Sequence, residues 1–366
     1  MMAFTSHART SVVCEPGALG RVGELARGLG FAHALLVADA GMVKAGFVDR
    51  AVRSLEAAGV RVTAWHGFGE NPDTDAAEAG RAFAANLPVD SIIGLGGGSS
   101  LDAAKAVNFL LTNGGTMHDY WGYAKAKHPL MPMIAVPTTT GTGSEAQSYA
   151  VISDAKTHRK MACGDPTAAV KIAVLDAELA AGQPKGVLAA SAYDAVAHAV
   201  ETWVCSKANA MSDCFAREAW RLLNENFERA LAGGGVDVAG RMQVASYLAG
   251  AAIEHSMLGA AHACANPLTQ RYGTTHGHAL AMLLPHVVRW NTAAVNGRYA
   301  DLHPELALRL EEMRHAAGLP RALGEAGVEM DLLPELSARA AEQWTGNFNP
   351  RKLDAAAAME LYLCAF

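Results

Sequence analysis

Residues 91–105 read SIIGLGGGSSLDAAK, and this stretch decides the fold that the sequence predicts. The segment 91–100 begins as a buried strand and runs into glycines, and 101–113 continues as a helix. Glycines at such a junction let the backbone approach a ligand closely, and the helix that follows offers free N–H groups to a phosphate. The segment is not a G-x-G-x-x-G fingerprint, because Ser99 and Leu101 interrupt it. It predicts a phosphate site, with a purely structural strand–helix turn as the alternative.

The flanking sequence alternates strands and helices. Strand-like runs are expected at 34–40, 60–68 and 131–139, and helical runs at 42–59 and 73–88. This rhythm is typical of a parallel sheet with crossover helices. After about residue 185, long Ala/Leu-rich helical patterns take over. The sequence therefore predicts an α/β N-terminal domain over 1–185 and an all-α C-terminal domain over 186–366.

Composition excludes several classes of partner. The chain has 366 residues, a formal charge of −6 and no basic run of five or more, so nucleic acid and anionic membranes are not expected partners. No uninterrupted apolar run reaches the length of a membrane span, and the N-terminus lacks the apolar core of a signal peptide. The six cysteines are scattered without a C-x-x-C pair, which indicates a reducing, cytoplasmic location.

A second loop and an acid are expected at the same edge of the sheet. PTTTGTGSE (137–145) follows a buried strand, and Asp39 ends another. In open α/β sheets ligands bind beyond the carboxyl ends of the strands. The two loops together suggest a nucleotide with a diphosphate. Asp39 could accept hydrogen bonds from a ribose diol and repel a 2′-phosphate, or it could be a helix N-cap. Both readings of Asp39 are open.

An acid and several imidazoles lie in apolar runs of the second half. In SAYDAVAHAVE (191–201), Asp194 and His198 are four residues apart and share one helix face. The stretch 259–286 adds four histidines, and His255 precedes it. Taken singly, each histidine suits an ordinary hydrogen-bonded role. One Asp with three His, however, suits Fe²⁺ or Zn²⁺ with room for a substrate oxygen, so the combination favours a metal site.

Taken together, these elements resemble the iron-containing, or group III, alcohol dehydrogenases. The resemblance rests on the order of GGGSSLDAAK, PTTTGTGSE, DAVAH, GAAHACANPL and THGHALAMLLPHVVRWN over nearly the full length. It implies the architecture shared with dehydroquinate synthase: a dinucleotide-binding α/β domain, a helical metal-binding domain and an active site in the cleft between them.

The resemblance also implies roles for individual residues. The residues that match the four metal ligands are Asp194, His198, His262 and His276. Those that match the family's cofactor contacts are Asp39, Asn71, Gly97, Gly98, Ser99, Thr138, Thr139, Thr142 and Lys160. Asp39 is the position associated with a preference for NAD.

The sequence departs from the family at one position. The family usually carries a second histidine four residues after the third ligand, and here that position is Asn266. In relatives this histidine helps to relay a proton or to orient the substrate. Asparagine hydrogen-bonds but does not titrate in this range. We therefore expect Asn266 to contact the substrate. We expect His278 or a water molecule to relay the proton instead.

The expected activity is hydride transfer between NAD(H) and a small primary alcohol or aldehyde, with Fe²⁺, or alternatively Zn²⁺, as Lewis acid on the substrate oxygen. The resemblance implies a homodimer or larger homo-oligomer. Same-fold alternatives are a polyol dehydrogenase, a maleylacetate-reductase-like enzyme and a dehydroquinate-synthase-like lyase. Further alternatives are a non-catalytic nucleotide-binding protein and a purely structural metal site.

Overall fold

The computed structural model describes residues 4–366, which form two compact units. The α/β unit comprises residues 7–139 and 144–182, and the helical unit comprises 183–366 together with 140–143 and 4–6. The chain thus leaves the α/β unit for four residues within the loop that follows Pro137, and then returns to it. This loop contains three of the expected cofactor residues, of which Thr138 and Thr139 belong to the α/β unit and Thr142 to the helical unit.

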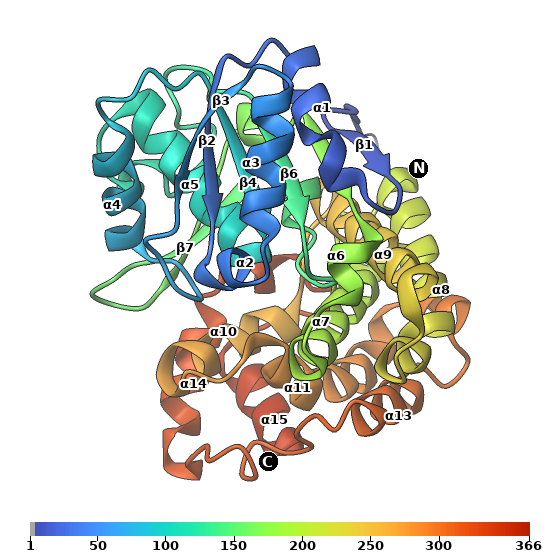
Figure 1. Cartoon of the computed structure of the whole chain (residues 1–366). Coiled ribbons are helices and arrows are strands. Elements are labelled where there is room, and N and C mark those ends of the chain that lie inside the picture. Colours follow the sequence, from blue (N-terminus) through green and yellow to red (C-terminus); the bar gives the residue numbers. More distant parts are fainter. Residues whose placement is uncertain (1–3) are drawn as a thin grey trace. The chain divides into compact units, whose positions relative to one another are not determined.

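The α/β unit is built on a six-stranded, wholly parallel sheet with the order β1-β9-β6-β4-β2-β3 (Figure 1). Its strands are β1 (Ser11–Cys14), β2 (His33–Ala38), β3 (Arg61–Trp65), β4 (Ser91–Gly96), β6 (Met133–Pro137) and β9 (Ile172–Leu175). In the register of the central strands, Gly96 pairs with Pro137 and Ala38 with Leu95. The segments that follow β2, β4 and β6 therefore leave the sheet at one edge, as the sequence predicted.

Helices cover both faces of this sheet (Figure 1). They are α1 (Val22–Gly28), α2 (Ala40–Lys44), α3 (Phe47–Ala57), α4 (Thr74–Ala84), α5 (Gly98–Asn113) and α6 (Ala177–Ala181). Ile93 and Leu95 of β4 share a buried core with α1 and α3. Gly94, between them, faces the other way, where a Cβ would meet Leu101 of α5 at 3.0 Å. A glycine here allows α5 to pack closely against the sheet.

Several expected boundaries are wrong. The helix expected over 42–59 is two helices, because Gly46 has φ +74 and starts α3 afresh after α2. The strand expected over 60–68 ends at Trp65, and the helix expected over 73–88 ends at Ala84. Helix α5 begins at Gly98, three residues before the expected 101, so the glycine loop is itself the helix N-terminus.

The sequence reading missed five strands of the α/β unit. Two of them, β1 and β9, complete the sheet on one side. The other three form a separate small sheet of order β5-β8-β7, whose strands are β5 (Gly122–Tyr123), β7 (Tyr149–Ser153) and β8 (Lys160–Gly164). The short 3-10 helices of this unit are η1 (Ala18–Arg21), η2 (Met117–Tyr120), η3 (Ser144–Ala146) and η4 (Pro166–Ala168).

The helical unit contains no strand anywhere in residues 183–366, in line with the prediction. Its α-helices are α7 (Lys185–Val204), α8 (Ala210–Leu231), α9 (Gly235–His255), α10 (Ala260–Tyr272), α11 (His276–Asn291), α12 (Arg298–Leu302), α13 (Leu306–Ala316), α14 (Leu333–Ala341) and α15 (Ala355–Ala365). The 3-10 helices are η5 (Thr292–Ala294), η6 (Met330–Leu332) and η7 (Trp344–Phe348). One apolar core joins these helices, and α7 runs through it with almost every residue from Ala189 onward buried.

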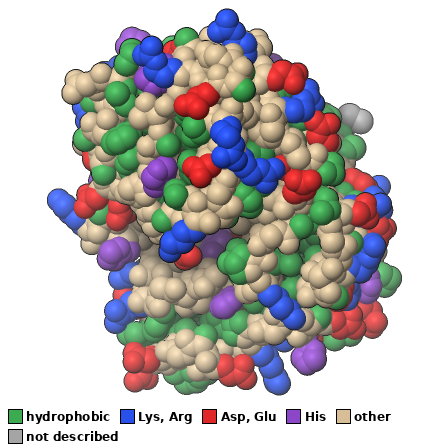
Figure 2. Space-filling view, viewed as in Figure 1, with side chains coloured by type: hydrophobic (Ala, Val, Ile, Leu, Met, Phe, Trp, Pro, Cys, Tyr) green, Lys and Arg blue, Asp and Glu red, His purple; other side chains and the backbone are tan. Residues whose placement is uncertain are grey.

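On the face drawn in Figure 2, acidic and basic side chains are interspersed, and no large patch of one charge sign forms there. Within residues 4–366, no helix combines the length and the apolar character that a membrane span requires.

Candidate metal centre and cofactor loops

At the carboxyl edge of the sheet, two of the expected cofactor residues, Asp39 and Asn71, are hydrogen-bonded to neighbouring serines at the start of α5. Asp39 caps α2, with Oδ1 accepting from Gly41 N at 2.8 Å, and its Oδ2 accepts from Ser100 Oγ at 2.8 Å. The hydroxyl of the adjacent Ser99 accepts from Asn71 N at 3.2 Å. The N-cap reading of Asp39 is therefore correct, and the carboxylate still lies against the glycine loop, where a ribose would be expected.

The glycine loop has little room for side chains. Gly97 is the N-cap of α5 and Gly98 its first residue. A Cβ on Gly97 would lie 3.2 Å from the methyl group of Thr139, and Thr138 N donates to Gly96 O at 2.9 Å. The loops after β4 and β6 are thus in contact at the N-terminus of a 16-residue helix, which has no side-chain cap. This arrangement suits a diphosphate.

A cluster of ionisable groups on α5 and in the segment packed against it was not predicted from the sequence. The ammonium group of Lys105 donates to the carbonyl oxygens of Ser144, Gln147 and Tyr149 at 2.6, 2.7 and 2.9 Å. Burial raises the pKa of Asp102 to about 6, although Lys105 and the hydroxyl of Ser144 oppose that shift. Burial likewise raises the pKa of Glu145 to about 7. Lys160, the remaining expected cofactor residue of this unit, starts β8 and opposes the shift at Asp102.

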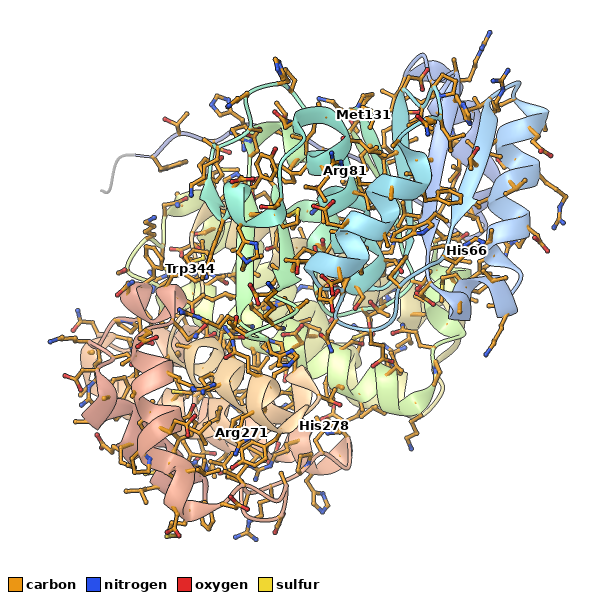
Figure 3. The ribbon with its side chains drawn as sticks, turned by 90° about the vertical axis from the view of Figure 1, so that its left-hand side faces the viewer. His66, Arg81, Met131, Arg271, His278 and Trp344 are labelled. Carbon is orange, nitrogen blue, oxygen red and sulfur yellow. The ribbon has the colours of Figure 1, made fainter. Side chains whose placement is uncertain are left out.

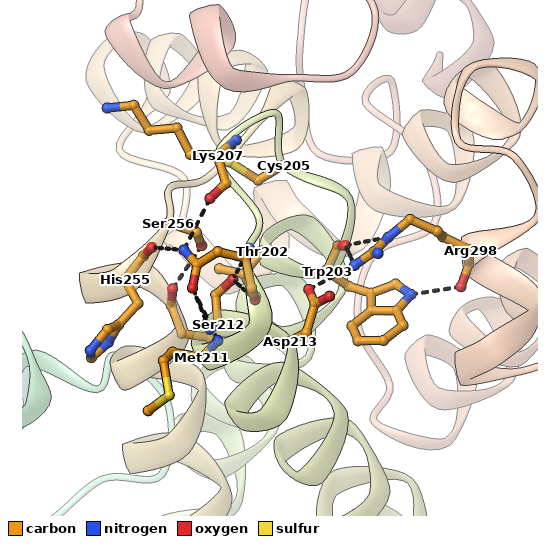
Figure 4. Close-up of polar contacts among 12 residues, drawn as sticks. Thr202, Trp203, Cys205, Lys207, Met211, Ser212, Asp213, His255, Ser256 and Arg298 are labelled. Atoms are coloured by element: carbon orange, nitrogen blue, oxygen red, sulfur yellow. Dashed lines mark hydrogen bonds and ion pairs between the residues drawn. The ribbon is translucent and has the colours of Figure 1, made fainter. Parts of the chain in front are cut away.

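In the helical unit, α7 carries two of the expected metal ligands on one buried face. Asp194 and His198 are both at least nine-tenths buried, and His198 Nε2 lies 3.1 Å from Asp194 Oδ1. The C-terminal end of α7 is anchored at Trp203, whose indole donates to Arg298 O at 2.6 Å while the Arg298 guanidinium donates to Trp203 O (Figure 4). The anchored, buried helix gives the two ligands little freedom to move.

The other two expected ligands come from the starts of two further helices and converge on the same oxygen. His262 lies in the first turn of α10, and His276 is the first residue of α11. Their Nε2 atoms lie 3.5 and 3.8 Å from Asp194 Oδ1. Ligand atoms of Asp194, His262 and His276 all lie within 4.8 Å of one another. His198 is outside that group of three, but its ring stacks on His262 with centroids 4.9 Å apart.

These distances fit a divalent ion. Ligand atoms at about 2.1 Å from a tetrahedral metal are about 3.4 Å apart, and the three nitrogens lie 3.1 to 3.8 Å from Asp194 Oδ1. Although buried, Asp194 Oδ1 and His262 Nε2 make no hydrogen bond of normal geometry. Buried polar atoms are costly to leave unsatisfied, and a cation would satisfy both. Burial raises the pKa of Asp194, but the three imidazoles outweigh burial and hold that pKa well below its usual value.

Glu201, which is 4% exposed, contacts His262 and was not predicted from the sequence as a site residue. Its Oε2 is hydrogen-bonded to His262 Nδ1, and its Oε1 accepts from Ala261 N at 2.6 Å. Burial lowers the pKa of His262, but Glu201 and Asp194 outweigh it and raise that pKa to about 9. The sequence did contain a signal, because positions 194, 198 and 201 share one helix face.

The two residues expected near the substrate lie in different surroundings. Asn266 is one turn after His262 on α10, is nearly buried, and donates from Nδ2 to Gln343 Oε1 at 3.1 Å. His278 is two residues after His276 and therefore points to another side of α11. It is half-buried, and burial lowers its pKa. Figure 3 labels His278 and Arg271 among the helices of this unit. The group formed by Asp194, His262 and His276 does not include it.

Known proteins match this chain over nearly its full length. Residues 9–177 match the family described as iron-containing alcohol dehydrogenase, and residues 188–366 match the C-terminal domain of the Fe-containing alcohol dehydrogenase family. The chain is 30% identical to lactaldehyde reductase of Escherichia coli (strain K12) over 96% of both chains. It is 31% identical to the NAD-dependent methanol dehydrogenase of Bacillus methanolicus over 92% of both chains.

Solved structures agree with this result. A crystal structure of 1,3-propanediol oxidoreductase superimposes on the chain with a TM-score of 0.96 and 31% identity, over the full length of both proteins. The fold expected from the sequence, an α/β dinucleotide-binding unit followed by an all-helical metal-binding unit, is the fold of this group. The chain therefore belongs to the iron-containing alcohol dehydrogenase family.

Proposed function

We propose that this protein is a metal-dependent, NAD(H)-linked alcohol dehydrogenase or aldehyde reductase acting on a small primary alcohol or aldehyde. The observation that carries the proposal is the convergence of three imidazole nitrogens on Asp194 Oδ1, in a chain of this family. Relatives named for lactaldehyde, methanol and 1,3-propanediol support a small substrate. In this proposal residues 1–185 bind the dinucleotide and residues 186–366 bind the metal.

Asp194, His198, His262 and His276 would hold the ion. When bound there, a divalent ion supplies Lewis-acid stabilisation of negative charge on the substrate oxygen. The family name favours Fe²⁺, and the nitrogen and oxygen donors also suit Zn²⁺. Asp194 provides the one negative charge of the set, and Asn266 offers an amide that orients a polar substrate without titrating. His278 or water carries the proton.

The α/β unit would bind NAD(H). The N-terminus of α5 at Gly97, Gly98 and Ser99 suits the pyrophosphate. Asp39 accepts from the ribose and disfavours a 2′-phosphate, which supports NAD over NADP. Asn71 is tied to Ser99 and would lie beside the cofactor. We assign further cofactor contacts to Thr138, Thr139, Thr142 and Lys160.

We also propose a cytoplasmic location and a homodimer or larger homo-oligomer. None of the six cysteines, all of which the structure describes, forms a disulfide, which fits a reducing compartment. Among residues 4–366, the outer strand β1 has no strand paired on its far side, and an exposed strand edge of this kind is a common site of association.

The test is a steady-state assay of NADH absorbance with a panel of short aldehydes, carried out on anaerobically purified protein before and after chelation and after reloading with Fe²⁺ or Zn²⁺. We expect NADH consumption that chelation abolishes and one of the two ions restores. Full turnover of the metal-free protein would favour the maleylacetate-reductase-like alternative. Tight binding of metal and NADH without turnover of any aldehyde would refute the proposal.

A further inference from the structure

The start of α10 depends on side chains from elsewhere in the helical unit. Its N-cap is Gly259, which has no side chain to accept a hydrogen bond. Ala260 N donates instead to Asn349 Oδ1 at 3.2 Å, and Ala261 N donates to Glu201 Oε1 at 2.6 Å. Because the first N–H groups of a helix have no partner within the helix, Glu201 and Asn349 fix where α10 begins. His262 is the next residue.

The second oxygen of Glu201 acts on His262 itself. Oε2 is hydrogen-bonded to His262 Nδ1. A carboxylate accepts but does not donate hydrogen bonds, so Nδ1 carries a proton, and in the neutral ring Nε2 then has the free lone pair that a cation requires. That Nε2 faces Asp194 Oδ1 at 3.5 Å. The contrast with His198 is clear, because His198 Nδ1 is buried with no hydrogen-bond partner in the described chain.

The absence of a side chain at Gly259 allows the Glu201 carboxylate to approach the start of α10 closely. A Cβ on Gly259 would lie 2.9 Å from Asn349 Oδ1 and 3.0 Å from Glu201 Oε1. The first distance is shorter than real Cβ contacts and the second is tighter than most of them, so an alanine at 259 would push one or both acceptors away. Glycine at this position keeps the carboxylate within reach of the helix start.

We propose that Glu201 is a positioning residue for metal binding: one carboxylate oxygen fixes the start of α10, and the other fixes the orientation and tautomer of the His262 ring, so that Nε2 is presented to the ion. This inference rests on the proposed function only in that the Asp194 set holds a divalent cation. A hydrogen-bonded carboxylate behind a metal-binding imidazole strengthens binding in the same way in other metalloproteins.

Glu201→Gln separates this role from simple packing, because glutamine has nearly the same shape. If its carbonyl accepts from Ala261 N, its amide donates to His262 Nδ1 and leaves the proton on Nε2, where the metal should bind. We expect the Kd for Zn²⁺, titrated into the metal-free full chain against a competing chelator, to rise by about 10- to 100-fold. The control is Glu360→Gln, which alters a carboxylate of the same unit that accepts from Trp290 Nε1 at 3.0 Å. Its Kd should match the wild type.

A conservative variant gives a second readout. Glu201→Asp changes the shape more than glutamine does but keeps a carboxylate, so it should retain more zinc affinity than Glu201→Gln. A purely structural role predicts the opposite order. If Glu201→Gln does not fold, Gly259→Ala displaces the carboxylate without altering it and should also weaken zinc binding.

Unchanged zinc affinity in folded Glu201→Gln, or an equal loss in Glu360→Gln, would overturn the inference and leave the proposed function intact. A wild-type protein that binds zinc and loses affinity in Glu201→Gln, but transfers no hydride, would overturn the proposed function and support the inference.

Discussion

Both units of this protein bury carboxylates, and they treat them in opposite ways. In the α/β unit, burial raises the pKa of Asp102 to about 6 and that of Glu145 to about 7, although the ammonium of Lys105 lies nearby. In the helical unit, three imidazoles hold the pKa of Asp194 well below its usual value. The surroundings of Asp102 and Glu145 favour the neutral carboxylic acid. The surroundings of Asp194 favour the charged carboxylate, which lies among imidazole nitrogens. The difference indicates that a buried acid alone does not mark a metal site, whereas convergent donors do.

The largest effect is expected from removing the charge at the point of convergence. Asp194→Asn should eliminate bound metal and reduce turnover by about a thousandfold or more, since a Lewis acid contributes several kcal/mol to such a reaction. NADH binding, measured by fluorescence titration, should change little, because all the proposed NADH contacts except Thr142 are in the other unit. A variant that lost metal and NADH binding together would show that the two functions are not separable in this way.

The next effect concerns the buried acid of the α/β unit. Because folding raises the pKa of Glu145 from 4.5 to about 7, this group contributes stability below pH 4.5 that is lost as the pH rises through 7. Glu145→Gln should therefore be more stable than the wild type at pH 8, by up to about 3 kcal/mol, and gain much less near pH 5. Denaturant unfolding of the metal-free protein at both pH values measures this. An equal effect at the two pH values would contradict the assignment.

A smaller effect is expected at the glycine loop. Gly97→Ala places a Cβ 3.2 Å from the Thr139 methyl group and into the space proposed for the pyrophosphate. The Kd for NADH should rise by about tenfold, which corresponds to about 1.4 kcal/mol. Metal content should stay at the wild-type value, the reverse of the pattern for Asp194→Asn. If NADH affinity does not change, the pyrophosphate does not bind at this helix start.

The smallest effect is expected at Asp39. Asp39→Gly removes an acceptor for the ribose and the repulsion of a 2′-phosphate, so the ratio of NADPH-linked to NADH-linked kcat/KM should rise by about threefold to tenfold. The control is Asp354→Gly, which removes another helix cap, bonded to Ala357 N at 3.0 Å. If NADPH-linked kcat/KM does not increase in Asp39→Gly, capping of α2 is the one role of Asp39 that has been demonstrated.

The sequence supported prediction of the parallel sheet, the helical second half and the family. It also identified Asp194 and the histidines as candidate ligands, because few residue types bind metals. It could not reveal Glu201 as a partner of His262, since 61 residues separate them and only the fold pairs them. In the small sheet, β5 was missed because it has only two residues, and the break between α2 and α3 was missed because a single Gly46 with positive φ causes it.

The most direct test of the central claim is elemental analysis of anaerobically purified wild-type protein and His276→Ala, with turnover of a short aldehyde measured on the same samples. We predict about one Fe²⁺ or Zn²⁺ per wild-type chain, and neither metal nor turnover in His276→Ala. Metal content and a rate equal to those of the wild type in His276→Ala would contradict a metal site formed by Asp194 and the three histidines.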